Sequence, residues 1–234
     1  MYEGFESQNF DFWDTQFQTN GTLAISNVNP AAGAYHMRAT VNAVAAQKRV
    51  CLLKSFPSAQ LKHVQAIIEY ANGDGASTNR LTLLALYPST ASDPYLAIIT
   101  MQGGKLYVQY RHSGGYPRLD TGAIMPPKTK ARLELSVKIG AGTGEVHAWL
   151  NGQEIANITG VDNSVDGQIS TMRTGAVFAD VDYPAEIVDV DEVRIEDAYI
   201  GIPPLDPTMR TLVPLVIICT FVVIGALSLR GKKT

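Results

Sequence analysis

The chain has 234 residues, 46% of them hydrophobic, with 19 basic and 22 acidic side chains and a formal net charge of −3 at pH 7. Four of the basic residues lie after the last acidic one, Asp206, so the preceding part carries 15 basic against 22 acidic groups, a net charge of −7. This balance argues against nucleic acid as a partner, because nucleic-acid binding needs a basic surface. About 200 residues suffice for one large domain with its own core.

Residues 1–200 are predicted to be all-β. Short runs that alternate apolar and polar residues are separated by clusters of Gly, Asn, Asp, Ser and Pro, and a helical period is almost absent. We expect strands at residues 23–28, 34–40, 49–56, 63–71, 80–87, 95–101, 105–112, 132–139, 145–150, 153–158, 175–181 and 187–195. Roughly a dozen strands in one domain predict a two-sheet antiparallel jelly-roll sandwich.

Three hairpin turns are marked by glycine-rich segments, at residues 103–104, 140–144 and 151–152. The last is Asn-Gly, and both residues accept the positive φ of a type I′ turn. In the final expected strand the apolar residues change parity between Val190 and Val193. This change predicts a β-bulge near Asp191-Glu192.

The C-terminal part predicts a membrane anchor. Residues 212–229 carry no charge, and as a helix with about 1.5 Å per residue they would extend roughly 27 Å, close to the thickness of a bilayer core. We therefore expect a Pro-rich linker at 201–210, a transmembrane helix at 211–229 and a basic tail at 230–234. The positive-inside rule places the tail in the cytoplasm and the β domain outside the cell, in a single-pass protein of the cell membrane.

Residues 1–4 show neither a basic nor an apolar signal-peptide region. Either a signal peptide has been removed, which we favour, or the protein is tail-anchored with its domain in the cytoplasm. Cys51 falls in an expected strand and Cys219 in the expected membrane span, so no disulfide is expected, and a prokaryotic surface fits best. The acceptor triplets at Asn20 and Asn157 agree with an outside location.

The order of several motifs resembles a known family. The motifs are Gly4-Phe5-Glu6-Ser7, Phe10, Trp13, residues 34–38, residues 132–137, residues 144–152 and residues 189–193. Together they resemble the concanavalin A-like lectin/glucanase fold, in its laminin-G-like branch, over nearly all of residues 3–200. Members of this family include carbohydrate-binding and adhesion modules, glycosidases and surface domains, so the resemblance implies the fold and leaves the function open.

The resemblance permits one test for hydrolysis. Family hydrolases carry two carboxylates on one strand face, about 5 Å apart, around the bond that is cleaved. In the nearest match, Glu186 and Asp189 have opposite parity and no glutamate follows at the required spacing, while Glu134 and Glu145 each stand alone. We therefore predict that the chain is not an enzyme.

The resemblance also implies a structural calcium site. Related modules bind calcium where the start and the end of the domain run side by side. The matching carboxylates here are Glu6 and Asp191, with Asp189 as a further oxygen donor, and backbone carbonyls would complete the set of oxygens that Ca²⁺ prefers. The alternative is an ordinary bulge with solvated carboxylates.

Alternation along two strands suggests a ligand face. Tyr107 and Arg111 point away from the apolar side of their strand, and His147 and Trp149 do so on theirs. These side chains offer stacking planes and hydrogen-bond donors for a sugar. The alternative is that the aromatic residues lie under a loop or against a neighbouring protein.

Two functions follow. The first is a membrane-anchored surface module that binds glycan or mediates adhesion. The second is a structural subunit whose sandwich packs against envelope proteins in a surface layer, filament, virion or membrane complex, as an oligomer or larger assembly. An aromatic and polar face that is solvent-exposed favours the first, and a face that is covered favours the second.

Overall fold

The computed structural model describes residues 1–72, 79–88 and 95–201. Met1–Ile200 forms the first of two units into which the chain divides. No helix within the described ranges is both long and apolar enough to cross a bilayer. The expected membrane helix and basic tail, and the linker after Gly201, lie outside the described residues, so they stay predictions.

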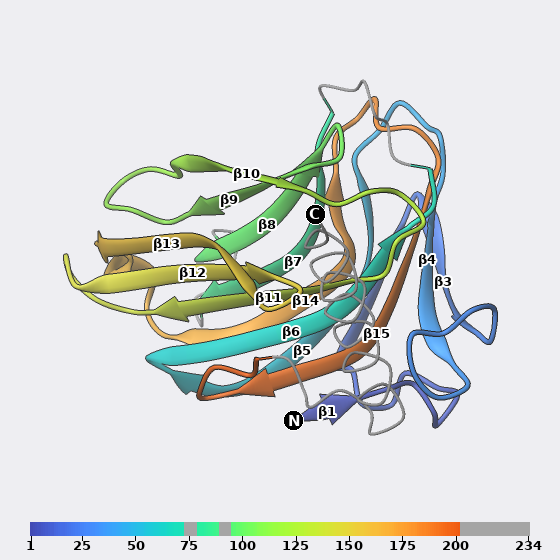
Figure 1. Ribbon diagram of the computed structural model, residues 1–234, viewed down its shortest axis with the longest axis horizontal. Helices are drawn as coiled ribbons and strands as arrows, with labels where there is room; N and C mark the ends of the chain where they lie inside the picture. The colour runs from blue at the N-terminus through green and yellow to red at the C-terminus, as the bar shows by residue number, and fades with distance from the viewer. Residues whose placement is uncertain (73–78, 89–94, 202–234) are drawn as a thin grey trace, which may run out of the picture. The chain divides into compact units, whose positions relative to one another are not determined.

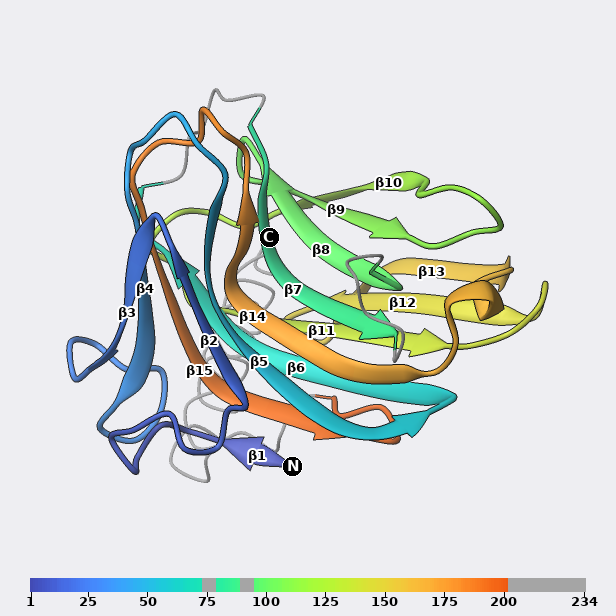
Figure 2. The same ribbon diagram turned by 180° about the vertical axis from the view of Figure 1, so that it is seen from behind.

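The first unit consists of two antiparallel sheets (Figures 1 and 2). Sheet A contains β1 (Tyr2–Glu3), β3 (Gly21–Ser26), β4 (His36–Val41), β6 (Leu61–Tyr70), β11 (Ala131–Lys138), β12 (Gly144–Leu150), β13 (Gln153–Val161) and β15 (Glu186–Glu196). Sheet B contains β2 (Thr15–Thr19), β5 (Lys48–Ala59), β7 (Leu81–Pro88), β8 (Ala97–Gln102), β9 (Lys105–Tyr110), β10 (Arg118–Ile124) and β14 (Ile169–Ala179). A 3₁₀ turn, η1 (Ser164–Asp166), precedes β14.

The order of strands places distant parts of the chain side by side. Sheet A runs β13-β12-β11-β6-β15-β4-β3, with β1 paired to β15, and sheet B runs β10-β9-β8-β7-β14-β5-β2. Sheet A lies toward the viewer in Figure 1 and sheet B in Figure 2. The prediction of an all-β, two-sheet antiparallel sandwich is confirmed.

Three strands were missed by the sequence analysis: β1, β2 and β10. β2 and β10 are the two edges of sheet B, and most of their residues are exposed. An edge strand that contributes few side chains to a core lacks the apolar alternation by which strands are recognised. β14 also begins earlier than expected, at Ile169, because two register shifts interrupt its alternation.

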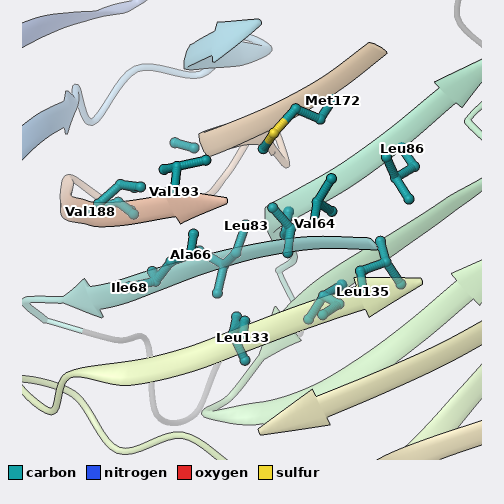
Figure 3. Packing of buried hydrophobic residues seen from close by; sticks show 14 of the residues in the cluster. Val64, Ala66, Ile68, Leu83, Leu86, Leu133, Leu135, Met172, Val188 and Val193 are labelled. Atoms are coloured by element: carbon teal, nitrogen blue, oxygen red, sulfur yellow. The ribbon is translucent and has the colours of Figure 1, made fainter. Parts of the chain in front are cut away.

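The two sheets share one apolar core. Val64, Ala66 and Ile68 of β6 gather with Leu83 and Leu86 of β7 in the space between the sheets (Figure 3). All five side chains are fully buried. Since side chains alternate along a strand, each strand that fills this core presents its remaining residues on an outer face.

The local turn predictions are confirmed. Gly103 and Gly104 have φ of 57° and 76°, and Asn151 and Gly152 have φ of 52° and 80°, as a type I′ hairpin turn requires. The expected bulge is present as a register shift of β15 between Asp191 and Arg194.

A buried lysine fixes the turn between β14 and β15. The Lys48 ammonium donates to the carbonyl oxygens of Asp180, Val181 and Tyr183 at 3.3, 2.6 and 2.9 Å. Burial lowers the pKa of Lys48. The Asp180 carboxylate in turn accepts from the Arg80 guanidinium at 3.1 and 3.2 Å, so this turn orients an arginine on the outer face of sheet B.

Lys48→Met should lower the free energy of unfolding. It retains the stem of the side chain but leaves the buried carbonyl oxygen of Tyr183 without its donor, at a cost of about 1–3 kcal/mol. Urea unfolding of the full chain measures the loss. An unchanged midpoint would show that the three hydrogen bonds do not stabilise the fold.

Candidate functional site

A second apolar cluster lies outside the core, on the outer face of sheet B. It consists of Cys51, Ala85, Tyr87, Ile98 and Val177, with Phe17 and Tyr95 packed against it. Above it is a cavity of about 250 Å³, which we call the sheet B groove. It is lined by Gln47, Arg49, Arg80, Thr82, Tyr87, Tyr95, Ile98, Thr100, Gln109, Val177 and Phe178. The strands that carry the groove lie toward the viewer in Figure 2.

Arginine side chains stack on aromatic rings along this face. The Arg173 guanidinium carbon lies 4.0 Å from the ring centroid of Tyr87 and 5.1 Å from that of Phe17. The Arg49 carbon lies 5.3 Å from the same Phe17 ring. Each such contact contributes about 0.5–2 kcal/mol, with the larger values at desolvated sites. The rings therefore hold both cations in fixed positions beside the apolar floor.

Neutral polar groups complete the groove. The hydroxyls of Thr82 and Thr100 are 3.3 Å apart, and Gln109 donates to the Tyr116 carbonyl oxygen at 3.2 Å. The Tyr95 and Tyr116 rings are 4.8 Å apart. A bound molecule would meet cations, hydroxyls, an amide and aromatic rings, the groups that orient a polar ligand over an apolar floor.

Two titratable groups of the floor stay protonated near neutral pH. Burial, followed by the charges of nearby groups, raises the pKa of the Tyr95 phenol above its usual range. Burial also raises the pKa of the Cys51 thiol to about 12. The Cys51 thiol is therefore no nucleophile, whereas the half-buried Tyr95 hydroxyl stays protonated and can donate a hydrogen bond.

The four residues predicted to form one ligand face are separated by the structure. Tyr107 lies on β9 in sheet B, and Arg111 follows it, paired with Asp166 at 2.7 Å. His147 and Trp149 lie on β12 in sheet A. A shared face is therefore wrong, because local alternation gives the outward side of a strand but does not assign the strand to a sheet.

On sheet A, His147 and Trp149 belong to an aromatic cluster. Their rings stack at 5.6 Å, and Trp149 also contacts Tyr199 at 4.9 Å. The His147 ring lies 2.7 Å from a Glu154 carboxylate oxygen. Both predicted residues are half-buried, so neighbouring side chains already cover much of this surface.

A hydrogen-bonded row beside that cluster was missed by the sequence analysis. The Ser136 hydroxyl lies 3.3 Å from His63 Nε2, and His63 Nδ1 lies 3.3 Å from Glu134 Oε1. Ser136 is only 2% exposed, and Glu134 also accepts the backbone N–H of Ile200 at 2.9 Å. The row resembles a Ser-His-Glu triad in order, but its serine is closed to substrate, so it joins strands and the end of the domain.

The three carboxylates predicted to bind calcium have protein partners. Glu6 accepts the backbone N–H groups of Ala34 and Tyr35, and Asp191 accepts those of Ala31 and Ala32, at 2.9–3.1 Å. Asp189 forms a bidentate pair with Arg38 at 2.7 and 2.8 Å and lies 3.2 Å from His36. Among the described residues, no three His, Cys, Asp or Glu side chains group as metal ligands. Calcium binding stays a prediction.

The two glycosylation triplets lie in different settings. Asn20 has φ of 59° in the turn between β2 and β3, and its side-chain amide donates to the Gln47 carbonyl oxygen at 2.8 Å. Asn157 is exposed on β13, an edge strand of sheet A. The Asn157 amide donates to a Glu154 carboxylate oxygen at 3.4 Å, a longer hydrogen bond than that of Asn20.

None of the residues that line the sheet B groove was among the predicted site residues. Arg49, Tyr87 and Arg173 come from strands that are far apart in the chain, β5, β7 and β14. The sequence does signal that these side chains point outward, because they alternate with core residues along their strands. It does not show that they lie together, which depends on the order of the strands in the sheet.

Comparisons with known proteins show the fold. No family model and no curated protein matches the chain. Among solved structures, "Cellulose induced protein, Cip1" is similar with a TM-score of 0.67 and 15% identity, over 87% of this chain and 100% of that one. The endo-β-1,4-glucuronan lyase of the fungus Trichoderma reesei is similar with a TM-score of 0.66 and 14% identity, over 86% of this chain and 97% of that one. Domain 4 of the arabinanase AbnA from Geobacillus stearothermophilus, in complex with arabinotriose, is similar with a TM-score of 0.53 and 15% identity, over 84% of this chain and 91% of that one.

These neighbours are jelly-roll sandwiches, consistent with the concanavalin A-like fold, whereas the laminin-G-like branch stays a prediction. They also correct the prediction that the chain is not an enzyme, since glucuronan and alginate lyases share this sandwich. The sequence argument tested only for the carboxylate pair of a hydrolase. A lyase cleaves by elimination, so the missing pair does not exclude an enzyme.

Asp189→Asn should destabilise the fold by about 2 kcal/mol at neutral pH, because it removes the charge that Arg38 and His36 bind. Burial alone would raise the Asp189 pKa, but these two partners more than offset it and hold the pKa below its usual value. The stabilisation is thus present above the ordinary carboxyl pKa of about 4 and is lost as the pH falls through the lower folded pKa. Urea unfolding at neutral and acid pH should show a difference that shrinks in acid, and a constant difference would contradict this account.

In a host that glycosylates Asn-x-Ser/Thr triplets, we expect a glycan on Asn157 and none on Asn20. Asn20 would have to give up a 2.8 Å hydrogen bond to Gln47, whereas the more exposed Asn157 would give up only a 3.4 Å contact with Glu154. Peptide mapping by mass spectrometry identifies the modified site. Asn157→Gln should abolish the glycan, and a glycan found on Asn20 would contradict the prediction.

Proposed function

We propose that the sheet B groove binds an acidic polysaccharide. The observation that carries this proposal is the placement of arginine. Four of the eight arginines in residues 1–200 lie on this one face of an acidic domain: Arg49, Arg80, Arg118 and Arg173. A planar guanidinium matches a carboxylate with two parallel hydrogen bonds, so a row of them suits a polymer with repeating carboxylates.

The floor of the groove supports a sugar rather than a small inorganic anion. Tyr87, Tyr95 and Ile98 supply apolar and aromatic surface, while Gln47 and Gln109 supply amide groups. Sugar rings combine an apolar face with hydroxyl groups around the edge, and both features have partners here. The glucuronan lyase and the arabinotriose complex, which share the fold, agree with a carbohydrate ligand.

The cations of this face meet one requirement of cleavage by β-elimination, the neutralisation of a uronate carboxylate. In that reaction a base removes the proton next to a uronate carboxylate, a carbon–carbon double bond forms, the glycosidic C–O bond breaks and the leaving oxygen takes up a proton. Cations that neutralise the carboxylate lower the barrier to the first step. We assign charge neutralisation to Arg49 and Arg173. The proton would pass to a water molecule as base and return to the leaving oxygen from solvent, since the described residues that line the groove include no carboxylate or imidazole.

The hydrophobic run at residues 212–229 would hold this groove at a membrane surface. The same anchor would serve the structural-subunit alternative, in which another envelope protein covers the sheet A cluster of His147 and Trp149. Protease added to intact cells distinguishes an outside from an inside location of the domain.

Arg49→Met should weaken binding of alginate about tenfold or more, since a charge-assisted hydrogen bond contributes about 1.5–3 kcal/mol. The full chain in detergent is titrated with alginate and with neutral dextran by calorimetry, and product is followed by the ultraviolet absorbance of the new double bond. Lys138→Met, which removes an exposed cation on sheet A, is the matched control.

Equal affinity for alginate and dextran would exclude an acidic-glycan site. Equal losses with Arg49→Met and Lys138→Met would exclude the sheet B groove as its location.

A further inference from the structure

The outer face of sheet B carries a row of side chains that extends beyond the cavity. Six strands contribute a cation or an aromatic ring to it: Phe17 (β2), Arg49 (β5), Arg173 (β14), Tyr87 (β7), Tyr107 (β9) and Arg118 (β10). The cavity covers only its middle, from β5 to β9. The row reaches both edges of the sheet, since β2 and β10 are its terminal strands.

At the β10 edge an arginine is held in place outside the cavity. Arg118 pairs in register with Gln109, a residue that lines the groove, so both side chains share the outer face. The Arg118 guanidinium carbon lies 3.6 Å from the Tyr107 ring centroid, and Arg118 also donates to the Gln102 side chain. The ring and the hydrogen bond orient an exposed cation at this edge.

One acidic group lies close to this arginine. Asp120 pairs in register with Tyr107, so it shares the outer face. Its Oδ1 accepts the backbone N–H of Gly122 at 2.9 Å, which commits one carboxylate oxygen to the turn of its own strand. Asp120 keeps its negative charge and offsets part of the Arg118 charge, so Arg118 is the group at this edge that an anion would contact.

Near the opposite edge, arginine side chains are likewise held against an aromatic ring. Arg49 and Arg173 flank the Phe17 ring, at 5.3 and 5.1 Å. Both ends of the row thus consist of arginine stacked on an aromatic ring. Arg49 also lines the cavity, which therefore reaches this end of the row, whereas Arg118 lies outside it. Strands in a sheet are about 4.8 Å apart, so the six spacings of this seven-stranded sheet carry the row across roughly 29 Å.

We propose that Arg118 and Tyr107 form a distal anion subsite, separate from the central cavity, so that the groove holds an internal stretch of a long acidic polysaccharide across all strands of sheet B. This inference rests on the proposed function and specifies its ligand as a polymer rather than a short oligosaccharide or a chain end. A chain of several sugar units would contact the central arginines and Arg118 together. A short oligomer would fill the cavity and leave Arg118 unused.

The experiment compares two probes on the full chain in detergent: an alginate disaccharide and long-chain alginate. Arg118→Ala should weaken binding of the long chain about tenfold and leave the disaccharide unchanged, whereas Arg49→Met should weaken both. Tyr107→Leu should act like Arg118→Ala, because it removes the ring that orients the guanidinium. Lys138→Ala on sheet A is the control and should change neither affinity.

The outcomes separate this inference from the proposed function. If Arg118→Ala weakens both probes equally, or neither, while Arg49→Met weakens both, the distal subsite is wrong and the acidic-glycan groove stands. If the unaltered protein binds neither probe, both are wrong. Circular dichroism of each variant confirms that a loss of affinity does not reflect unfolding.

Discussion

The structure depends on one constraint: alternate side chains of both sheets must fill a single core. In β5, Val50 and Leu52 enter that core, which sends Arg49 and Cys51 to the outer face of sheet B. In β8 the same alternation buries Ile99 and turns Thr100 outward. A shift of one residue in either strand would exchange the side chains that face the core with those that face outward. Burial of the core therefore also determines which groups the groove presents.

The groove itself is covered by long amphipathic side chains instead of a third layer. Cys51, Ala85 and Val177 are nearly fully buried, although they face away from the core. Arg173 is only 7% exposed and stacks on Tyr87 and Phe17, so its stem shields apolar surface while its guanidinium stays beside the cavity. The same contacts that stabilise this face therefore preorganise its cations for a ligand.

The two outer faces differ in chemistry. On sheet A, His63, Gln65 and Glu134 form a buried polar network that also receives the backbone of Ile200. There the polar groups bind one another and the end of the domain. On sheet B, cations stand over an apolar floor with open space above them, which is why a ligand is assigned to that side.

The sequence by itself determined the all-β class, the hairpin turns and the bulge after Val190, because each depends on neighbours within a few residues. Asn151-Gly152 adopts positive φ whatever lies around it, and a change of parity marks a bulge in any sheet. Only the tertiary structure decided that Tyr107 and Trp149 face opposite ways, and that Arg49, Arg173 and Tyr87 meet. Antiparallel sheets pair strands that are far apart in sequence, and alternation states which side of a strand is apolar without stating which strand lies beside it.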